Sequence, residues 1–248
     1  MVESASMPDS QLLPDASNLV TEDDTPVDNF ASAKQQRLLA GTLYSAIGDR
    51  VFLAEANVGI YHTVREPAIV PDVFLSIGVR VPENWWEKQN RCYLLWQFGK
   101  PPEVAIEIVS NRQGDELDRK LHLYERMRVS YYVVFDPGQN LGESILYVYE
   151  LRGARYVEMV RDGREMQPVW LEQVELGLTL WDGDFEGSPG LWLRWCDRDG
   201  TVLPTGDERA RDAEERARRA ERQAQRMAAQ LQALGIEPDT ESGDEPAE

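Results

Sequence analysis

The chain has 248 residues, of which 44 are acidic and 26 are basic, so its formal net charge is −18 at pH 7. It contains no run of about 18 apolar residues, which excludes a membrane span. Its first residues lack the pattern of a secretion signal and it has only two cysteines, so we expect a cytoplasmic protein with reduced thiols. Two cysteines and two histidines without ligand-like spacing disfavour zinc. The acidity also argues against nucleic acid as a partner, because that affinity comes largely from lysine and arginine.

The negative charge is concentrated at the two ends of the chain. Residues 1–33 hold seven acids, three prolines and no base, which predicts a disordered acidic tail. Residues 204–248 hold 12 acids and seven arginines, and their last part, 239–248, is predicted to be a second disordered acidic tail. The middle of the chain, 34–203, keeps a net charge of only −6. The net charge of the whole chain is therefore weaker evidence against a nucleic-acid partner for this middle part than the value of −18 suggests.

The middle part is predicted to be one α/β domain. Leucines at helical spacing predict a helix over 34–47 that Gly48 can end. Apolar and β-branched runs predict strands, which are 51–53, 58–61, 68–77, 104–109 and 131–135. An amphipathic helix is predicted over 115–128, and a hairpin over 145–149 and 156–160. The order strand, helix, strand favours a crossover connection within a mixed sheet.

The segment 204–238 is predicted to be a separate helix. Apolar residues from Ala210 to Leu234 recur at alternating steps of three and four, which is an unbroken heptad pattern. This pattern favours a coiled coil, and we expect a homo-oligomer formed through residues 210–234. A solitary charged helix held by local ion pairs is the alternative.

Two carboxylates interrupt apolar rows on predicted strands. Alternation places Asp72 between Val70 and Phe74 on one face, and Glu107 between Ala105 and Val109 on another. An unpaired buried carboxylate costs several kcal/mol, so each must be protonated, paired or bound to a cation. Two acids on neighbouring strands could share Mg²⁺, which prefers oxygen ligands and often takes one or two carboxylates.

Further groups could complete such a site. The backbone carbonyl of Ile108 could supply another oxygen ligand, and Lys120 lies at the edge of the apolar stripe of its predicted helix. An ammonium there could orient a water molecule or stabilise charge on a phosphate. Simpler interpretations remain open, because structural ion pairs also produce buried acids. Asp72 could be an acid in a turn at the end of a strand, and Glu107 could form a structural salt bridge with Arg112 or Arg119. Lys120 could be an ordinary residue beside the apolar stripe of its helix.

The tryptophans near the end of the domain allow two interpretations. Trp181, Trp192 and Trp195 are expected to cover the core with their rings. Stacking on DNA bases is the alternative role.

Several short motifs occur in an informative order. These are Pro71-Asp72, the strand from Ile106 to Asn111, Lys120-x-x-x-Tyr124, and the run from Tyr131 to Pro137. Together they resemble the Uma-two family of endonucleases, within the PD-(D/E)XK restriction-endonuclease-like superfamily, over roughly residues 34–200. The resemblance implies a mixed central sheet flanked by helices and Mg²⁺- or Mn²⁺-dependent cleavage of DNA. It implies that Asp72 and Glu107 are the two acidic motif residues.

One motif position departs from the superfamily pattern. The pattern expects lysine two positions after the second acid, where this chain has Val109. Members of the resembled family often place this lysine on the following helix, where Lys120 lies. Two functions therefore remain: a nuclease that uses Asp72, Glu107 and Lys120, or a catalytically degenerate nuclease fold that serves as an interaction or oligomerisation module.

Overall fold

The computed structural model describes residues 29–110, 116–159 and 167–234. The predicted tails therefore lie outside the described residues, apart from positions 29–33, and so do Asn111 and Arg112. Contacts divide the chain into two units, Met1–Leu203 and Pro204–Glu248. None of the helices in the described ranges has both the length and the apolar character needed to span a membrane.

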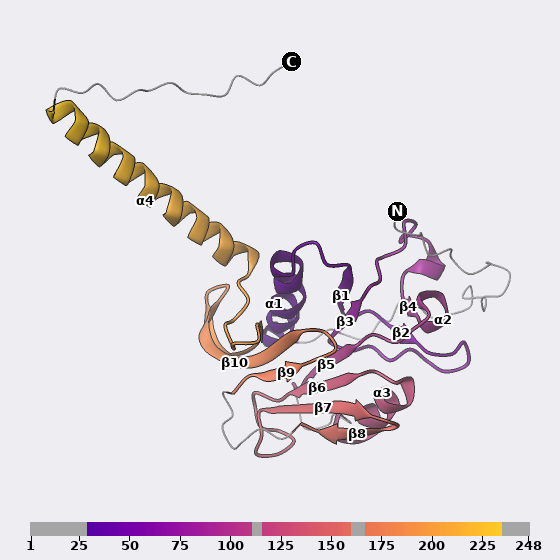
Figure 1. Ribbon diagram of the computed structural model, residues 1–248. Helices are drawn as coiled ribbons and strands as arrows, with labels where there is room; N and C mark the ends of the chain where they lie inside the picture. The colour runs from indigo at the N-terminus through magenta and orange to yellow at the C-terminus, as the bar shows by residue number, and fades with distance from the viewer. Residues whose placement is uncertain (1–28, 111–115, 160–166, 235–248) are drawn as a thin grey trace. The chain divides into compact units, whose positions relative to one another are not determined.

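A six-stranded mixed sheet forms the centre of the first unit (Figure 1). In spatial order its strands are β1 (Phe52–Ala56), β3 (Val73–Ile77), β5 (Val104–Ile108), β6 (Tyr131–Phe135), β7 (Leu146–Arg152) and β8 (Arg155–Glu158). β5 and β6 are parallel, and every other neighbouring pair is antiparallel. The chain crosses from β5 to β6 through a π-helical turn (Glu116–Lys120) and helix α3 (Leu121–Met127). The predicted mixed α/β fold with a strand–helix–strand crossover is thus confirmed.

Smaller elements complete this unit. They are helix α1 (Phe30–Ala46), the strand pair β2 (Ile60–Tyr61) and β4 (Tyr93–Leu94), a short 3₁₀ helix (Lys88–Asn90), helix α2 (Leu95–Phe98), and a three-stranded antiparallel sheet of β9 (Val169–Leu171), β10 (Leu176–Phe185) and β11 (Ser188–Cys196).

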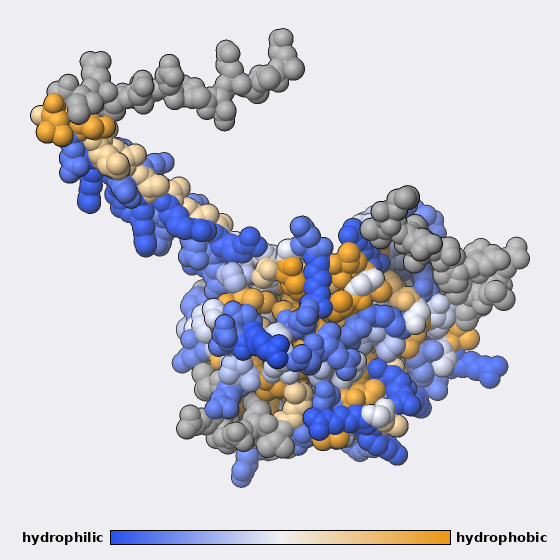
Figure 2. All heavy atoms as spheres, viewed as in Figure 1, coloured by the Kyte–Doolittle hydropathy of each residue, from blue (hydrophilic) through white to orange (hydrophobic). Residues whose placement is uncertain are grey.

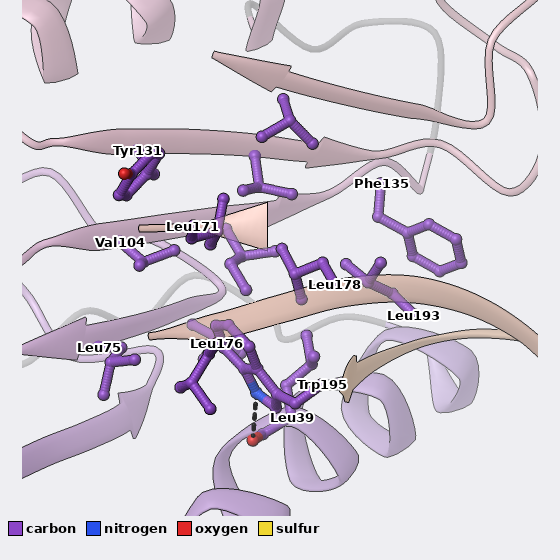
Figure 3. Close-up of a cluster of buried hydrophobic side chains, with 14 of the residues drawn as sticks. Leu39, Leu75, Val104, Tyr131, Phe135, Leu171, Leu176, Leu178, Leu193 and Trp195 are labelled. Atoms are coloured by element: carbon purple, nitrogen blue, oxygen red, sulfur yellow. Dashed lines mark hydrogen bonds between the residues drawn. The ribbon is translucent and has the colours of Figure 1, made fainter. Parts of the chain in front are cut away.

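The central sheet has an apolar core on each face. On one face, residues of β3, β5 and β6 pack against α1 and the β9–β11 sheet (Figure 3). Trp195 is fully buried there, and its indole N–H donates a hydrogen bond of 3.0 Å to the carbonyl of Leu39. The other face carries a second cluster, in which Phe74, Ala105 and Tyr132 of the sheet pack with Tyr124 of α3. The predicted role of Trp195 in covering the core is confirmed.

Helix α1 begins earlier than the sequence pattern indicated. It starts at Phe30 because the Asn29 side chain accepts a hydrogen bond of 3.0 Å from the backbone N–H of Ser32. Residues 30–33, which we assigned to the acidic tail, are therefore helical. The tail boundary at residue 33 was wrong because this cap was overlooked.

Helix α4 (Gly206–Ala233) makes up the described part of the second unit. It begins with a capping box, in which Thr205 and Glu208 satisfy each other's backbone N–H groups. None of its residues is buried, and a continuous apolar stripe runs along the helix surface (Figure 2). The helix itself agrees with the pattern, and its self-association stays a prediction. The last residues of the predicted helical segment, 235–238, lie outside the described part of the chain.

Candidate active site

Asp72 lies immediately before β3, at the end of the ladder between β3 and β5. Its Oδ2 accepts a hydrogen bond of 2.6 Å from the backbone N–H of Ile108, and its Oδ1 accepts one of 2.7 Å from Nε2 of Gln36 in α1. The side chain thus takes the place of a backbone acceptor where the strand begins. This carboxylate joins α1, β3 and β5 at one point.

Glu107 is the fourth residue of β5 and is only 2% exposed. Its Oε2 accepts a hydrogen bond of 2.8 Å from Nζ of Lys120, and its Oε1 accepts one of 2.7 Å from the hydroxyl of Tyr124. Val73 pairs with Ile106, so the next position along the antiparallel register places Asp72 opposite Glu107. The two acids that the sequence singled out are therefore neighbours across two adjacent strands.

Lys120 ends the π-helical turn that precedes α3. Besides Glu107, its ammonium contacts Oε1 of Glu116 at 3.3 Å. Glu116 is itself held in place, because its carbonyl accepts a hydrogen bond of 2.9 Å from the hydroxyl of Tyr132. The other carboxylate oxygen of Glu116 is buried and has no hydrogen-bond partner among the residues that the structure describes. The structure thus surrounds one lysine with two buried carboxylates, and the ion-pair partner of Glu107 is Lys120.

Burial and charge shift the protonation of this cluster. Burial raises the pKa of Glu107 to about 7, and the nearby charge of Asp72 adds to this rise, although Lys120 and Tyr124 act against it. Burial alone would lower the pKa of Lys120, but Glu107, Glu116 and Asp72 together raise it above its usual value. Lys120 is therefore an ammonium near neutral pH, whereas Glu107 changes its charge there. Such a pair of shifted groups is common at catalytic sites.

The donors fit a hard divalent cation. Asp72 and Glu107 offer carboxylate oxygens, and a strand residue directs its N–H and C=O to the same side, so the Ile108 carbonyl is expected on the side where Asp72 accepts the Ile108 N–H. Mg²⁺ needs only one or two carboxylates because it keeps several waters. Glu116 Oε2, which has no hydrogen-bond partner in the described part of the chain, is a further buried acceptor on the carboxylate that contacts Lys120. Among the described residues, no three His, Cys, Asp or Glu side chains are placed so that together they could hold a metal ion, so the fit rests on two carboxylates and a backbone carbonyl.

Two residues of this cluster, Gln36 and Glu116, were not predicted from the sequence. Gln36 is 5% exposed and lies three and seven residues before Leu39 and Leu43, which belong to the buried face of α1. A polar amide on that apolar face was an available signal. Glu116 offered no comparable signal, because a glutamate in the first turn of a helix is ordinary.

Val109, at the position where the superfamily pattern expects lysine, is buried in the second apolar cluster. Lys120 instead brings an ammonium to Glu107 from the following helix. The chain thus lacks a lysine at position 109, but Lys120 contacts Glu107 from another element.

Comparison with known proteins identifies the family of the chain. The sequence model of the Uma2 family, described as "Putative restriction endonuclease", matches residues 21–180. A crystal structure described as a putative nuclease belonging to DUF820, from Anabaena variabilis, is similar at 17% sequence identity with a TM-score of 0.46, over 62% of this chain and 80% of that chain. No curated protein matches. The family match covers well over half of the sequence and confirms the resemblance noted above: the chain belongs to the Uma2 family of restriction-endonuclease-like proteins.

Proposed function

We propose that this chain is a metal-dependent endonuclease that hydrolyses phosphodiester bonds of DNA. In this proposal Asp72, Glu107 and the backbone carbonyl of Ile108 hold Mg²⁺ or Mn²⁺, and Lys120 assists. The observation that carries the proposal is the convergence of Asp72, Glu107 and Lys120 from three elements at one end of β3 and β5. Membership of a family of nucleases makes hydrolysis of nucleic acid the reaction to test.

The charge states assign each side chain a task. A bound divalent ion polarises the phosphate and lowers the pKa of a bound water. Lys120 stays protonated near neutral pH, so it acts as a positive charge that orients the water and offsets charge on the phosphate, rather than as a base. The water oxygen bonds to phosphorus as the water loses a proton to solvent, the bridging P–O bond breaks, and the leaving oxygen gains a proton. Glu107 must be ionised to serve as a ligand, and its pKa is about 7. The rate of cleavage should therefore rise as the pH increases through about 7.

A plasmid-nicking assay with Mg²⁺ or Mn²⁺ tests this function. We expect cleavage to need the metal and to fall by at least about 100-fold in Asp72→Asn and Glu107→Gln, the lower range for removing a group that acts on the transition state. Glu158→Gln, which changes an exposed acid of β8, is the matched control and should cleave like the wild type. Equal cleavage by all four proteins would mean that a contaminant is responsible and would overturn the proposal.

The second candidate is a catalytically degenerate nuclease fold that acts as an interaction or oligomerisation module. Val109 at the expected lysine position favours it, as does the exposed apolar stripe on α4 (Figure 2). Absence of both cleavage and calorimetric metal binding in a folded protein would support this alternative over the nuclease.

Whichever of the two functions the protein has, we propose that two copies of the chain associate through the apolar heptad positions of α4. Leu231→Arg places a charge on the apolar stripe and should reduce the mass measured by light scattering to that of one chain. Ala229→Arg introduces the same side chain on the exposed opposite side and should leave the mass unchanged. A wild-type mass equal to that of one chain would reject self-association.

A further inference from the structure

An aromatic cleft lies on the same face of the central sheet as the candidate active site. Its volume is about 470 Å³, within the range of about 300–1,000 Å³ typical of ligand pockets. Phe74, Tyr93 and Phe98 line its inner part, with Phe74 edge-on to Tyr93 and Tyr93 stacked on Phe98 at a ring separation of 4.2 Å. Trp85 and Trp86 line it from the loop before β4.

The sheet register fixes how far the cleft lies from the acids. Phe74 of β3 is two residues beyond Asp72, and it pairs with Ala105, two residues before Glu107. Side chains two apart share a face and are separated by about 7 Å along the strand. On the other side Phe74 pairs with Glu55 of β1, which also lines the cleft. The cleft therefore begins about 7 Å from the carboxylates. This distance equals about two nucleotide steps along a DNA strand, at about 3.4 Å each.

The two tryptophans of this cleft are far more exposed than the aromatic rings of the core. Trp85 is 49% exposed and Trp86 is 72% exposed, although their rings stack on each other at 4.2 Å. The loop that carries them is held in place, because the guanidinium of Arg91 donates a hydrogen bond of 3.1 Å to the Trp86 carbonyl. Exposed, positioned indoles are suited to stack on a flat apolar ring, and base–aromatic stacking contributes about 1–3 kcal/mol per base.

The polar groups of the cleft match the edge of a nucleobase better than an aliphatic ligand. The carboxyl group of Glu55 is partly buried at the cleft wall, where a carboxylate can accept a hydrogen bond from an exocyclic amino group. Arg91 adds a positive charge beside the aromatic rings, which suits a phosphate-bearing ligand. A base inside a duplex is covered on both faces by its neighbours, so it can reach such rings only after leaving the stack.

We propose that this cleft binds an unpaired nucleobase of the strand whose backbone lies at Asp72 and Glu107, so that single-stranded or locally unpaired DNA is the preferred substrate. The proposal rests on the nuclease function proposed above for the position of the backbone, and it adds the class of DNA that the site accepts. The two tryptophans are binding residues here and take no part in bond breaking.

Binding can be measured apart from cleavage. Fluorescence anisotropy of a labelled single-stranded oligonucleotide, with Ca²⁺ in place of Mg²⁺, should show tighter binding than the duplex of the same sequence. Trp85→Ala and Trp86→Ala should each weaken single-strand binding by roughly 5- to 100-fold, the range that corresponds to loss of one stacked base. Trp170→Ala, at a partly exposed tryptophan on β9, is the matched control and should bind like the wild type. Both cleft variants replace exposed rings, and far-ultraviolet circular dichroism will verify their fold.

The outcomes separate the two proposals. Wild-type binding and wild-type cleavage by both cleft variants would overturn the cleft proposal, while metal-dependent cleavage that is lost in Asp72→Asn would leave the nuclease intact. Tryptophan-dependent binding of single strands without any cleavage would support the cleft and reject the nuclease. Equal affinity for single-stranded and duplex DNA would overturn the cleft as a site for unpaired bases.

Discussion

Replacing Glu107 with glutamine should remove a large part of the pH dependence of folding stability between pH 5 and pH 8. Burial raises the pKa of Glu107 from 4.5 to about 7, so the folded chain binds this proton more tightly than the unfolded chain. The stabilisation is complete below pH 4.5 and is lost as the pH rises through about 7. At about 1.4 kcal/mol per pH unit, the wild type should lose roughly 2–3 kcal/mol between pH 5 and pH 8 through this group. Glutamine does not titrate and should lose none of it.

Urea unfolding at pH 5 and pH 8, in the presence of EDTA, measures this difference. The comparison of the two pH changes, wild type against Glu107→Gln, cancels the contributions of titrating groups that do not interact with Glu107. Glu158→Gln changes an exposed acid and should follow the wild type. Parallel pH profiles for wild type and Glu107→Gln would refute the conclusion that Glu107 is a buried acid with a raised pKa.

Three further results are expected from the same structure. Mg²⁺ binding below pH 7 should release a proton from Glu107, so calorimetric heats should differ between buffers of different ionisation heat, and identical heats would contradict this coupling. Tyr124→Phe removes a hydrogen bond that lowers the pKa of Glu107, so the pH at which cleavage is half-maximal should rise; an unchanged midpoint would contradict it. Leu193→Ala, at a fully buried core position, should cost about 2–5 kcal/mol in urea unfolding. Val64→Ala, at 42% exposure, should cost less than about 0.5 kcal/mol, and equal costs would contradict the assignment of the core.

The sheet was predictable wherever both of its faces are covered. The run from Tyr131 to Phe135 forms β6 with the predicted bounds, because all five of its residues are buried and have large apolar or aromatic side chains, as is typical of a strand covered on both faces. The three strands β9–β11 were not predicted. The turn between β10 and β11 uses Glu186 and Gly187, both at positive φ, and a glutamate is not a residue that signals such a turn.

The candidate site shows a different limit of prediction from sequence. The apolar run 68–77 predicted a continuous strand through Asp72, but β3 begins only at Val73. Asp72 lies outside the strand because its own carboxylate, rather than a backbone carbonyl, accepts the Ile108 N–H. Alternation still placed Asp72 beside Glu107, so the error in the strand boundary did not disturb the pairing of the acids. The polar amide of Gln36 on an apolar helix face was visible in the sequence, but its contact with Asp72 was not, since the two residues are 36 positions apart and on different elements.

In the proposed nuclease, the position of Lys120 would let an incomplete short motif still bring an ammonium to the buried glutamate. The strand period of two places Val109 on the same face as Glu107, so a lysine there would be the simplest way to bring an ammonium to this carboxylate. In this chain that space is apolar, and Val109 packs in the cluster that includes Tyr124 and Tyr132. The helix that covers this face delivers Lys120 instead, at 2.8 Å from Glu107. Catalysis depends on the location of a charge relative to the phosphate, and helix packing fixes that location as firmly as strand spacing does.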